Sequence, residues 1–310
     1  MRNALLTVAL TGSLLLSGAA ARAEIDWSRV DAVMDKEAAI IGTVHKYPLP
    51  RSDLHVTLDS VEVKPALALG GWVAFQQIGA DAMMMGDLVL SESEVRPVMR
   101  SLLADGVSVT AIHNHLLRAS PATLYMHVSG FGDPVVLARA VREALAETKT
   151  PFAPAAQAAP GTVSPGFDVA KLDTILGAKG KNSGGVWQFS FPRPDDIRVA
   201  GMAMPPAMGV ATALNFEPTG DGKAAISGDF VLLGKEVPAL LKTLDSNGVE
   251  VTALHNHMLN DEPRLFFAHV WAHDDAVKLA MALRAGLDVI GSNQTSIPPA
   301  PAPGHASSSP

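Results

Sequence analysis

Six of the ten histidines recur in two sets with the same spacing. Each set has an H-x-H pair followed twelve residues later by a third histidine: His113, His115 and His127, then His255, His257 and His269. In a strand, residues i and i+2 point to the same face, so each H-x-H pair projects two imidazoles together. A returning strand would bring the third histidine to them. Three neutral imidazoles with an open fourth position are typical of a catalytic zinc site, and copper also suits imidazole ligands.

The strand that carries the first pair is expected to place the two imidazoles on the same face as Val107, Val109 and Ala111. The alternative is that the histidines are hydrogen-bonded core residues. Three further possibilities stay open: both triads bind metal, one triad has lost its metal, or histidines of both sets converge on one metal. An HNH nuclease is excluded, because its three residues are dispersed over a ββα unit and this chain is acidic.

Two glutamates are candidates for acid/base catalysis or metal binding, Glu94 and Glu236. Glu94 stands three residues after Ser91, so a capping box is the simpler interpretation. That interpretation weakens in the second set, where Leu233 takes the place of Ser91 and Glu236 remains.

Two arginines are candidates for binding an anionic substrate, Arg51 and Arg193. The alternative is a local ion pair with Asp53 and with Asp195. Asn114 and Asn256 are expected to satisfy backbone groups. The run Met83–Met85 is expected to be core rather than a copper site.

These residues belong to a unit that the chain contains twice, offset by 142 residues. The segment from Asp105 to Leu117 repeats from Asn247 to Leu259, with nine of thirteen positions identical. The same offset relates Gly86-Asp87 to Gly228-Asp229. A constant offset from about residue 30 to about residue 145 indicates a tandem duplication.

The elements that must position the site follow from periodicity and turn residues. The predicted elements of the first unit are a helix at 31–41, strands at 56–63, 72–77 and 83–90, a helix from Ser91 to Gly106, strands at 107–115 and 124–128, and a helix at 133–147. The fold class is therefore α+β, a tandem duplication of a β-β-β-α-β-β-α unit in two pseudo-symmetric halves.

Composition excludes several classes of protein. The chain has 310 residues, 48% of them hydrophobic, which is enough for real cores. With a net charge of −7, it lacks the basic surface of a nucleic-acid binder. The absence of cysteine excludes disulfides, thiolate zinc sites and lipidation at a lipobox. No P-loop, dinucleotide fingerprint or Gly-x-Ser-x-Gly elbow is present, so no nucleotide cofactor is expected.

The N-terminus is typical of a secretory signal peptide. Arg2 precedes an apolar run from Leu5 to Leu16, and Ala21-Arg22-Ala23 is a small-x-small cleavage site. The run is too short to span a membrane. We therefore expect a periplasmic, non-lipidated protein. The predicted organisation is a signal peptide at 1–23, a first repeat domain at 24–149, a Pro/Ala/Gly linker at 150–166, a second repeat domain at 167–296 and a disordered tail at 297–310.

The motifs Pro-Arg-x-Asp, Gly-Asp-(Leu/Phe)-Val-Leu, Glu-Val and Thr-Ala-(Ile/Leu)-His-Asn-His together resemble the LppY/LpqO family. This resemblance covers roughly residues 27 to 290. It implies a bacterial envelope protein with two repeats and a domain of unknown function. The lipoprotein members have a lipobox cysteine that this chain lacks. The ligand pattern alone is also similar to that of acetolactate decarboxylase, whose zinc is held by an H-x-H…H set.

Two functions follow as hypotheses. The first is a zinc-dependent enzyme, of lyase or hydrolase type, acting on a small anionic substrate, with the histidines as ligands and Glu94 as acid/base. The second is a non-catalytic metal-binding, sensing or partner-binding protein of the envelope. The sequence leaves the oligomeric state open.

Overall fold

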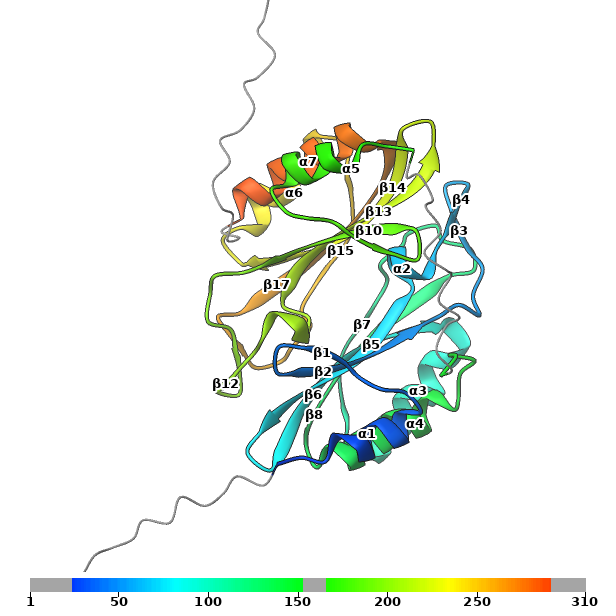
Figure 1. Cartoon of the computed structure of the whole chain (residues 1–310), viewed down its shortest axis with the longest axis vertical. Coiled ribbons are helices and arrows are strands. Elements are labelled where there is room, and N and C mark those ends of the chain that lie inside the picture. Colours follow the sequence, from blue (N-terminus) through cyan, green and yellow to red (C-terminus); the bar gives the residue numbers. More distant parts are fainter. Residues whose placement is uncertain (1–23, 153–165, 291–310) are drawn as a thin grey trace, which may run out of the picture.

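The computed structural model describes residues 24–152 and 166–290 (Figure 1). The predicted signal peptide, residues 153–165 of the predicted linker and the predicted tail lie outside the described residues. The described start of the linker is packed rather than free: Phe152 lies against the first core, with the Arg142 guanidinium 3.5 Å from the centre of its ring.

Each repeat contains three main helices and six strands of one sheet, with short additional elements. The first repeat comprises α1 (Trp27–Met34), β1 (Ala39–Ile41), β2 (Val44–Pro50), β3 (Val56–Leu58), β4 (Val61–Val63), α2 (Pro65–Ala68), β5 (Gly70–Ile78), β6 (Asp81–Ser91), α3 (Glu92–Ala104), β7 (Ser108–His113), β8 (Thr123–Gly132) and α4 (Pro134–Leu145). The second comprises α5 (Val169–Leu176), β9 (Lys181–Ser183), β10 (Val186–Pro192), β11 (Arg198–Val199), β12 (Met202–Ala203), the 3₁₀ helix η1 (Pro206–Met208), β13 (Ala211–Gly220), β14 (Lys223–Leu233), α6 (Val237–Ser246), β15 (Glu250–His255), β16 (Asp261–Glu262), β17 (Leu265–Asp275) and α7 (Ala276–Val289).

The two large sheets are antiparallel and have matching strand orders. The first runs β1-β2-β5-β6-β8-β7, and the second runs β9-β10-β13-β14-β17-β15. Helices α1, α3 and α4 lie at one end of the molecule and α5, α6 and α7 at the other, with the two sheets between them (Figure 1). The molecule is thus a four-layer arrangement in which the sheets face each other and helices cover their outer faces.

Alternation along the strands explains these layers. Along β6, Met84 and Leu88 belong to the core beneath the helices, while Met83 and Met85 belong to a core shared with the second repeat. Since successive side chains of a strand point to opposite faces, a strand buried on both sides is apolar throughout. The prediction that Met83–Met85 is core is confirmed.

Short segments of each repeat cover the sheet of the other. Helix α2 lies against the second sheet, where Gln188 and Asn215 donate hydrogen bonds to the carbonyls of Ala66 and Leu67. In return, η1 lies against β2 and β5, and Lys46 donates a hydrogen bond to the Ala207 carbonyl. The two repeats therefore form one body.

The α+β class and the two-repeat organisation hold, but the repeat unit differs from the prediction. The first helix starts earlier, at Trp27, because Asp26 caps it with its side chain. The predicted helix at 31–41 ends at Met34, and residues 39–41 form strand β1 instead. Strand β2 was not predicted, since Pro48 and Pro50 lack the N–H donor of a central strand. The predicted strand at 56–63 is two short strands, because Asp59 and Ser60 turn the chain with positive φ angles. Among the described helices, none is long and apolar enough to cross a membrane.

Candidate metal centre

A β-bulge in each repeat sets the direction of the histidines. Strand β7 pairs with β8, and the register shifts between Val109 and Ala111, leaving Thr110 as the extra residue. Ala111 then lies opposite His127, and His113 lies opposite Tyr125. The predicted hairpin is present, but Val107 and Val109 face the helix-covered core instead of sharing the histidine face. The bulge reverses the alternation that the sequence implies.

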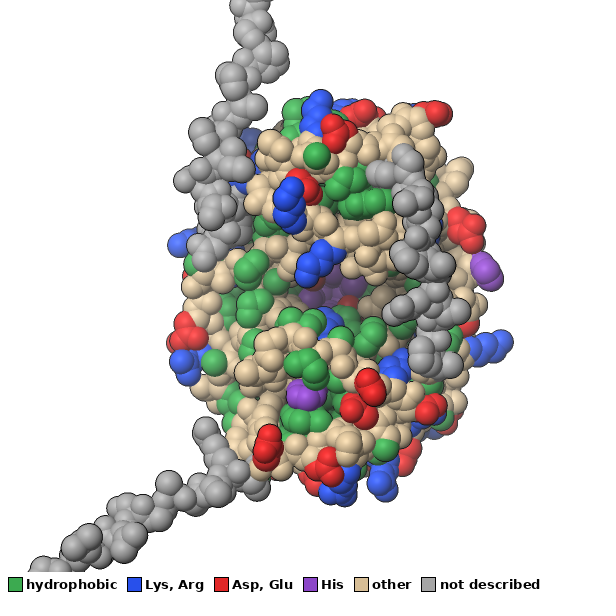
Figure 2. Space-filling view, viewed as in Figure 1, with side chains coloured by type: hydrophobic (Ala, Val, Ile, Leu, Met, Phe, Trp, Pro, Cys, Tyr) green, Lys and Arg blue, Asp and Glu red, His purple; other side chains and the backbone are tan. Residues whose placement is uncertain are grey.

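All six histidines converge between the two sheets. Three pairs of rings stack across the repeats with their centroids 3.5–3.7 Å apart: His113 on His255, His115 on His269, and His127 on His257. In the face shown in Figure 2, histidine side chains lie in a central hollow with Lys or Arg side chains at its edge. The histidines are thus one cluster to which both repeats contribute.

The cluster has approximate two-fold symmetry. The ring centroids of His113 and His127 are 4.9 Å apart, as are those of His255 and His269. The central pair, His113 and His255, is partly exposed, whereas the other four histidines are buried. The approximate axis therefore passes between the two most accessible imidazoles.

Two aspartates lie beside the imidazoles. Asp87 is directly opposite His127 in the β6–β8 pair, and Asp229 is opposite His269 in the β14–β17 pair. Oδ2 of Asp87 is 3.9 Å from Nε2 of His115, and Oδ2 of Asp229 is 3.7 Å from Nε2 of His257.

The glycine before each aspartate has a packing reason. A Cβ atom on Gly86 would come within 2.7 Å of Cγ1 of Val73, and one on Gly228 within 2.9 Å of Cδ2 of Leu214. The repeated Gly-Asp motif therefore combines close packing with an acidic group on the opposite face of the strand.

Four sets of three side chains have potential ligand atoms within 4.8 Å of one another. One is His255, His257 and His269, the set predicted for the second repeat. In the first repeat, Asp87 joins His115 and His127 instead of His113. The remaining two sets mix the repeats: His113, His115 and His269, and His113, His127 and His255. The described residues thus group histidines across the repeats as well as within them.

The imidazoles are held in the neutral form that binds metal. Burial lowers the pKa of His113 to about 3 and that of His255 to about 4. Burial, together with the neighbouring imidazoles, lowers the pKa of the other four histidines well below the usual value.

The aspartates shift in the opposite direction. Burial raises the pKa of Asp87 to about 7, and the nearby charge of Lys46 opposes this rise. Burial and the charge of Asp87 raise the pKa of Asp229 well above its usual value. A bound cation would favour the ionised form of both carboxyls.

Threonines at the two bulges connect the repeats. Oγ1 of Thr110 donates to the carbonyl of His257 at 2.6 Å, and Oγ1 of Thr252 donates to the carbonyl of His115 at 2.7 Å. Each repeat thus fixes the backbone of the other's H-x-H segment. The sequence carried a signal for these residues, since threonine stands three residues before the H-x-H pair in both repeats.

The predicted catalytic glutamates and substrate arginines pair with each other. Arg51 is 1% exposed and donates five hydrogen bonds, two to Asp53, two to Glu94 and one to the carbonyl of Val89. With all five N–H donors used, the structure offers no donor of Arg51 to a substrate.

The second repeat has the same arrangement. Arg193 donates two hydrogen bonds to Glu236, one to Asp195 and one to the carbonyl of Val231. The local ion pairs with Asp53 and Asp195 are therefore present in both repeats.

Glu94 also accepts hydrogen bonds from the backbone N–H groups of Ser91 and Lys149. Burial opposes ionisation of Glu94, but the hydrogen bonds from Arg51 and Ser91 outweigh it and lower its pKa. Glu236 similarly accepts from the N–H of Leu233, so this half of the capping box persists without the serine. These contacts support a structural role at the start of the helix for both glutamates.

The two asparagines between the histidines bind backbone groups, as predicted. Oδ1 of Asn114 accepts a hydrogen bond from the N–H of Leu116, and Nδ2 of Asn256 donates to the carbonyl of Leu265. They hold the turns that follow the two histidine-bearing strands.

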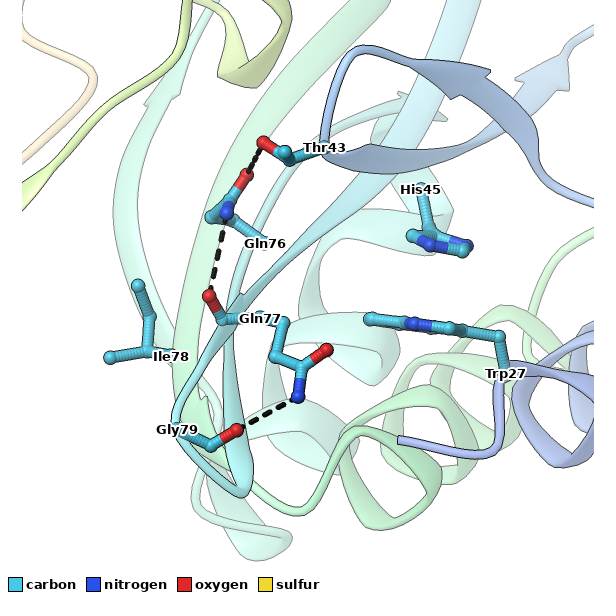
Figure 3. A pocket seen from close by; sticks show the side chains of 7 residues that line it. All are labelled: Trp27, Thr43, His45, Gln76, Gln77, Ile78 and Gly79. Carbon is cyan, nitrogen blue, oxygen red and sulfur yellow. Dashed lines mark hydrogen bonds between the residues drawn. The ribbon is translucent and has the colours of Figure 1, made fainter. Parts of the chain in front are cut away.

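A separate cleft of about 500 Å³ lies beside α1 (Figure 3). It is lined by Trp27, Thr43, His45, Gln76, Gln77, Ile78 and Gly79. The rings of Trp27 and His45 stack on each other 3.7 Å apart, and no Lys, Arg, Asp or Glu is among the lining residues. This cleft contains none of the clustered histidines.

Comparison with solved structures finds only remote similarity. A trimeric bacterial microcompartment shell protein, PduB, is 14% identical over 81% of this chain and 88% of its own, with a TM-score of 0.21. EtuB from Clostridium kluyveri is 10% identical over 82% and 91%, with a TM-score of 0.19. At these TM-scores the similarities support no conclusion about this protein. No curated protein matches the sequence.

One family matches both repeats, at residues 28–147 and 170–289. These two segments cover more than half of the chain and contain both histidine sets. The chain therefore belongs to the family described as Domain of Unknown Function (DUF1259), of which it contains two tandem copies.

Proposed function

We propose that the six histidines and Asp87 form a composite centre for divalent transition metal, shared between the repeats, with zinc as the preferred ion. One observation carries this proposal. Buried imidazole nitrogens in the cluster have no hydrogen-bond partner: Nδ1 of His113, Nε2 of His127, both nitrogens of His255, and Nε2 of His257 and His269. An unpaired buried polar atom costs about 1–3 kcal/mol, so several together favour a bound ligand.

The donor set selects the class of metal. Neutral imidazole with one or two carboxylates suits zinc, copper(II) and related ions, while magnesium and calcium prefer oxygen ligands alone. Two of the four sets share no residue, namely Asp87 with His115 and His127, and His255 with His257 and His269. The centre therefore has ligands for up to two ions.

Catalysis is the function that this arrangement favours. Three protein ligands leave a position for water or substrate on a zinc ion, which then serves as Lewis acid or water activator. His113 and His255 are partly exposed, so the centre lies next to solvent, although their unpaired nitrogens are buried. A carrier or storage protein would instead surround the ion with a fourth protein ligand.

The cellular location is a separate part of the proposal. We infer export to the periplasm from the signal peptide predicted at 1–23, and membership of the LppY/LpqO group from the sequence motifs. The domain boundaries at 24–149 and 167–296 also remain predictions. Fractionation of cells that express the full chain, with cleavage after Ala23 read by mass spectrometry, tests the export.

The metal centre is tested by the metal content of the mature chain, purified without a histidine tag. We expect about one or two equivalents of zinc per chain. His115→Ala combined with His255→Ala should lower the content to below about a tenth of this value, because each of the four ligand sets contains one of these two residues. The matched control is His55→Ala, since the side chain of His55 is 85% exposed and pairs with Glu62, outside the histidine cluster.

Zinc titration provides a second measurement for variants that fold poorly. Binding to the native state raises the melting temperature, so zinc should stabilise the wild-type chain and the His55→Ala variant but not the double variant. Magnesium should stabilise none of them. Absence of bound zinc or copper, with no binding at micromolar concentration, would reject the proposal and leave the histidines as structural residues.

A further inference from the structure

The two halves of the centre differ at two positions on the face between the sheets. Lys46 on β2 corresponds to Gln188 on β10, because each lies four residues before the proline that ends its strand. Trp72 lies opposite Asp87, and the residue opposite Asp229 is Ala213. At these two positions the first repeat has a cation and an indole ring, and the second repeat has neither.

Lys46 is partly buried without a close carboxylate. Its Nζ lies 4.0 Å from the centre of the Trp72 ring and 3.4 Å from the Ala207 carbonyl oxygen. No Asp or Glu within the described residues forms an ion pair with it at 4.0 Å or less. Burial lowers the pKa of Lys46 to about 8, and the charge of Asp87 opposes this change. An ammonium group in this setting is stabilised by an anion.

Strand register connects Lys46 to the metal ligands. Lys46 is diagonal to Trp72 in the β2–β5 pair, Trp72 is opposite Asp87, and Asp87 is opposite His127. These four residues follow one another across the face between the sheets. A ligand atom at the metal centre would therefore have the ammonium of Lys46 on its β2 side, and the Trp72 ring lies against that ammonium as an apolar surface.

We propose that Lys46 and Trp72 form an anion-binding subsite of the metal centre, which accepts a small oxyanion of the carboxylate class on the first-repeat side. This inference rests on the proposed metal centre and names the class of ligand that it takes. One carboxylate oxygen would bind the metal and the other would accept a hydrogen bond from Lys46.

The other polar groups considered for this role are already committed. The donors of Arg51 are all used by its own repeat. Gln188 donates to the Ala66 carbonyl at 2.8 Å and carries no charge. The first-repeat side and the second-repeat side of the metal centre are therefore expected to differ in anion affinity.

The test uses the mature chain loaded with cobalt(II), whose visible spectrum reports changes in its ligands. Acetate is the probe, and acetamide is its neutral control. The key variant is Lys46→Gln, which introduces the residue that the second repeat has at this place. Lys46→Arg retains the charge and serves as the rescue variant.

We expect Lys46→Gln to bind acetate about tenfold more weakly or worse, with an unchanged cobalt content. Lys46→Arg should retain most of the affinity, and acetamide should bind all three proteins equally weakly. An equal acetate affinity in the wild type and in Lys46→Gln, both with full cobalt content, would overturn the subsite and leave the metal centre in place. Failure of the wild-type chain to bind cobalt would instead reject the centre itself, and the subsite with it.

Discussion

The two repeats share the residues that build the scaffold and differ in residues that border the centre. Both have the Arg–Glu pair, the Gly-Asp motif, the bulge threonine and the three histidines. Around the centre, Lys46, Trp72 and Tyr125 of the first repeat correspond to Gln188, Ala213 and Phe267 of the second. The duplication has thus kept the ligands symmetric while the surroundings became asymmetric. Ligand preference can change in this way without loss of the fold.

The largest expected effect concerns the shared scaffold. Arg51→Ala and Arg193→Ala each leave a buried glutamate without its partner, which costs about 3–5 kcal/mol. We expect similar losses in the free energy of unfolding, measured by urea denaturation, because the two pairs have the same contacts. Arg51→Lys and Arg193→Lys, which keep the charge but not the paired hydrogen bonds, should recover part of the loss. A large loss of unfolding free energy in only one of the two Arg→Ala variants would show that the two pairs do not stabilise their repeats equally.

A smaller effect is expected at the threonines that join the repeats. Thr110→Val removes the hydrogen bond to the His257 carbonyl, and Thr252→Val removes the bond to the His115 carbonyl. Each variant should lose about 1–3 kcal/mol of stability. Zinc affinity should fall about tenfold or more, because backbone support orients the ligands.

Competition with a chelating dye measures the affinity, and Thr→Ser at either position, which retains the hydroxyl, is the control. If Thr→Val weakens stability but leaves zinc affinity intact, these bonds join the repeats without orienting the ligands.

The smallest effect is a difference between the two aspartates in the metal-free protein. A carboxyl with a raised pKa in the folded state stabilises fully below its unfolded pKa of 3.8, and this contribution is lost as pH rises through the folded pKa. Asparagine mimics the protonated form. At pH 8, Asp229→Asn and Asp87→Asn should therefore both be more stable than the wild type, and below pH 3.8 both should approach it.

The gain at pH 8 should be larger for Asp229→Asn, since Lys46 already compensates the charge of Asp87. Thermal denaturation at the two pH values in the presence of a chelator measures the difference. Combining each substitution with Lys46→Gln should remove it. If Asp87→Asn and Asp229→Asn gained equal stability at pH 8 in the presence of Lys46, the lysine would not distinguish the two sides of the centre.

Periodicity and repetition predicted the features that depend on local sequence. The helix after Ser91, the hairpin that carries the histidines, and the Asn114 and Asn256 contacts follow from spacing and turn residues. The bulge at Thr110 was not predictable, because the amino-acid pattern on either side of it alternates without a visible interruption. For that reason, the prediction that Val107 and Val109 lie on the same face as the histidines was wrong.

Contacts between residues far apart in the sequence were also not predictable from local patterns. The pairing of Arg51 with Glu94 spans 43 residues, and no local pattern links the two. Arg193 and Glu236 have the same separation, but so does every pair of residues kept in both repeats, so the spacing alone did not mark the contact. Lys46 gave no signal either, because its counterpart is glutamine. Residues that distinguish the repeats are invisible to an argument based on repetition.

The threonine bonds cross from each repeat to the other, and so do the stacked histidine pairs. A single repeat therefore holds only half of the centre. An ancestral chain with one repeat would have completed it by pairing with a second copy around a two-fold axis, as an isologous homodimer. Fusion of the two copies made assembly independent of protein concentration, and only after it could one half acquire a lysine that the other lacks.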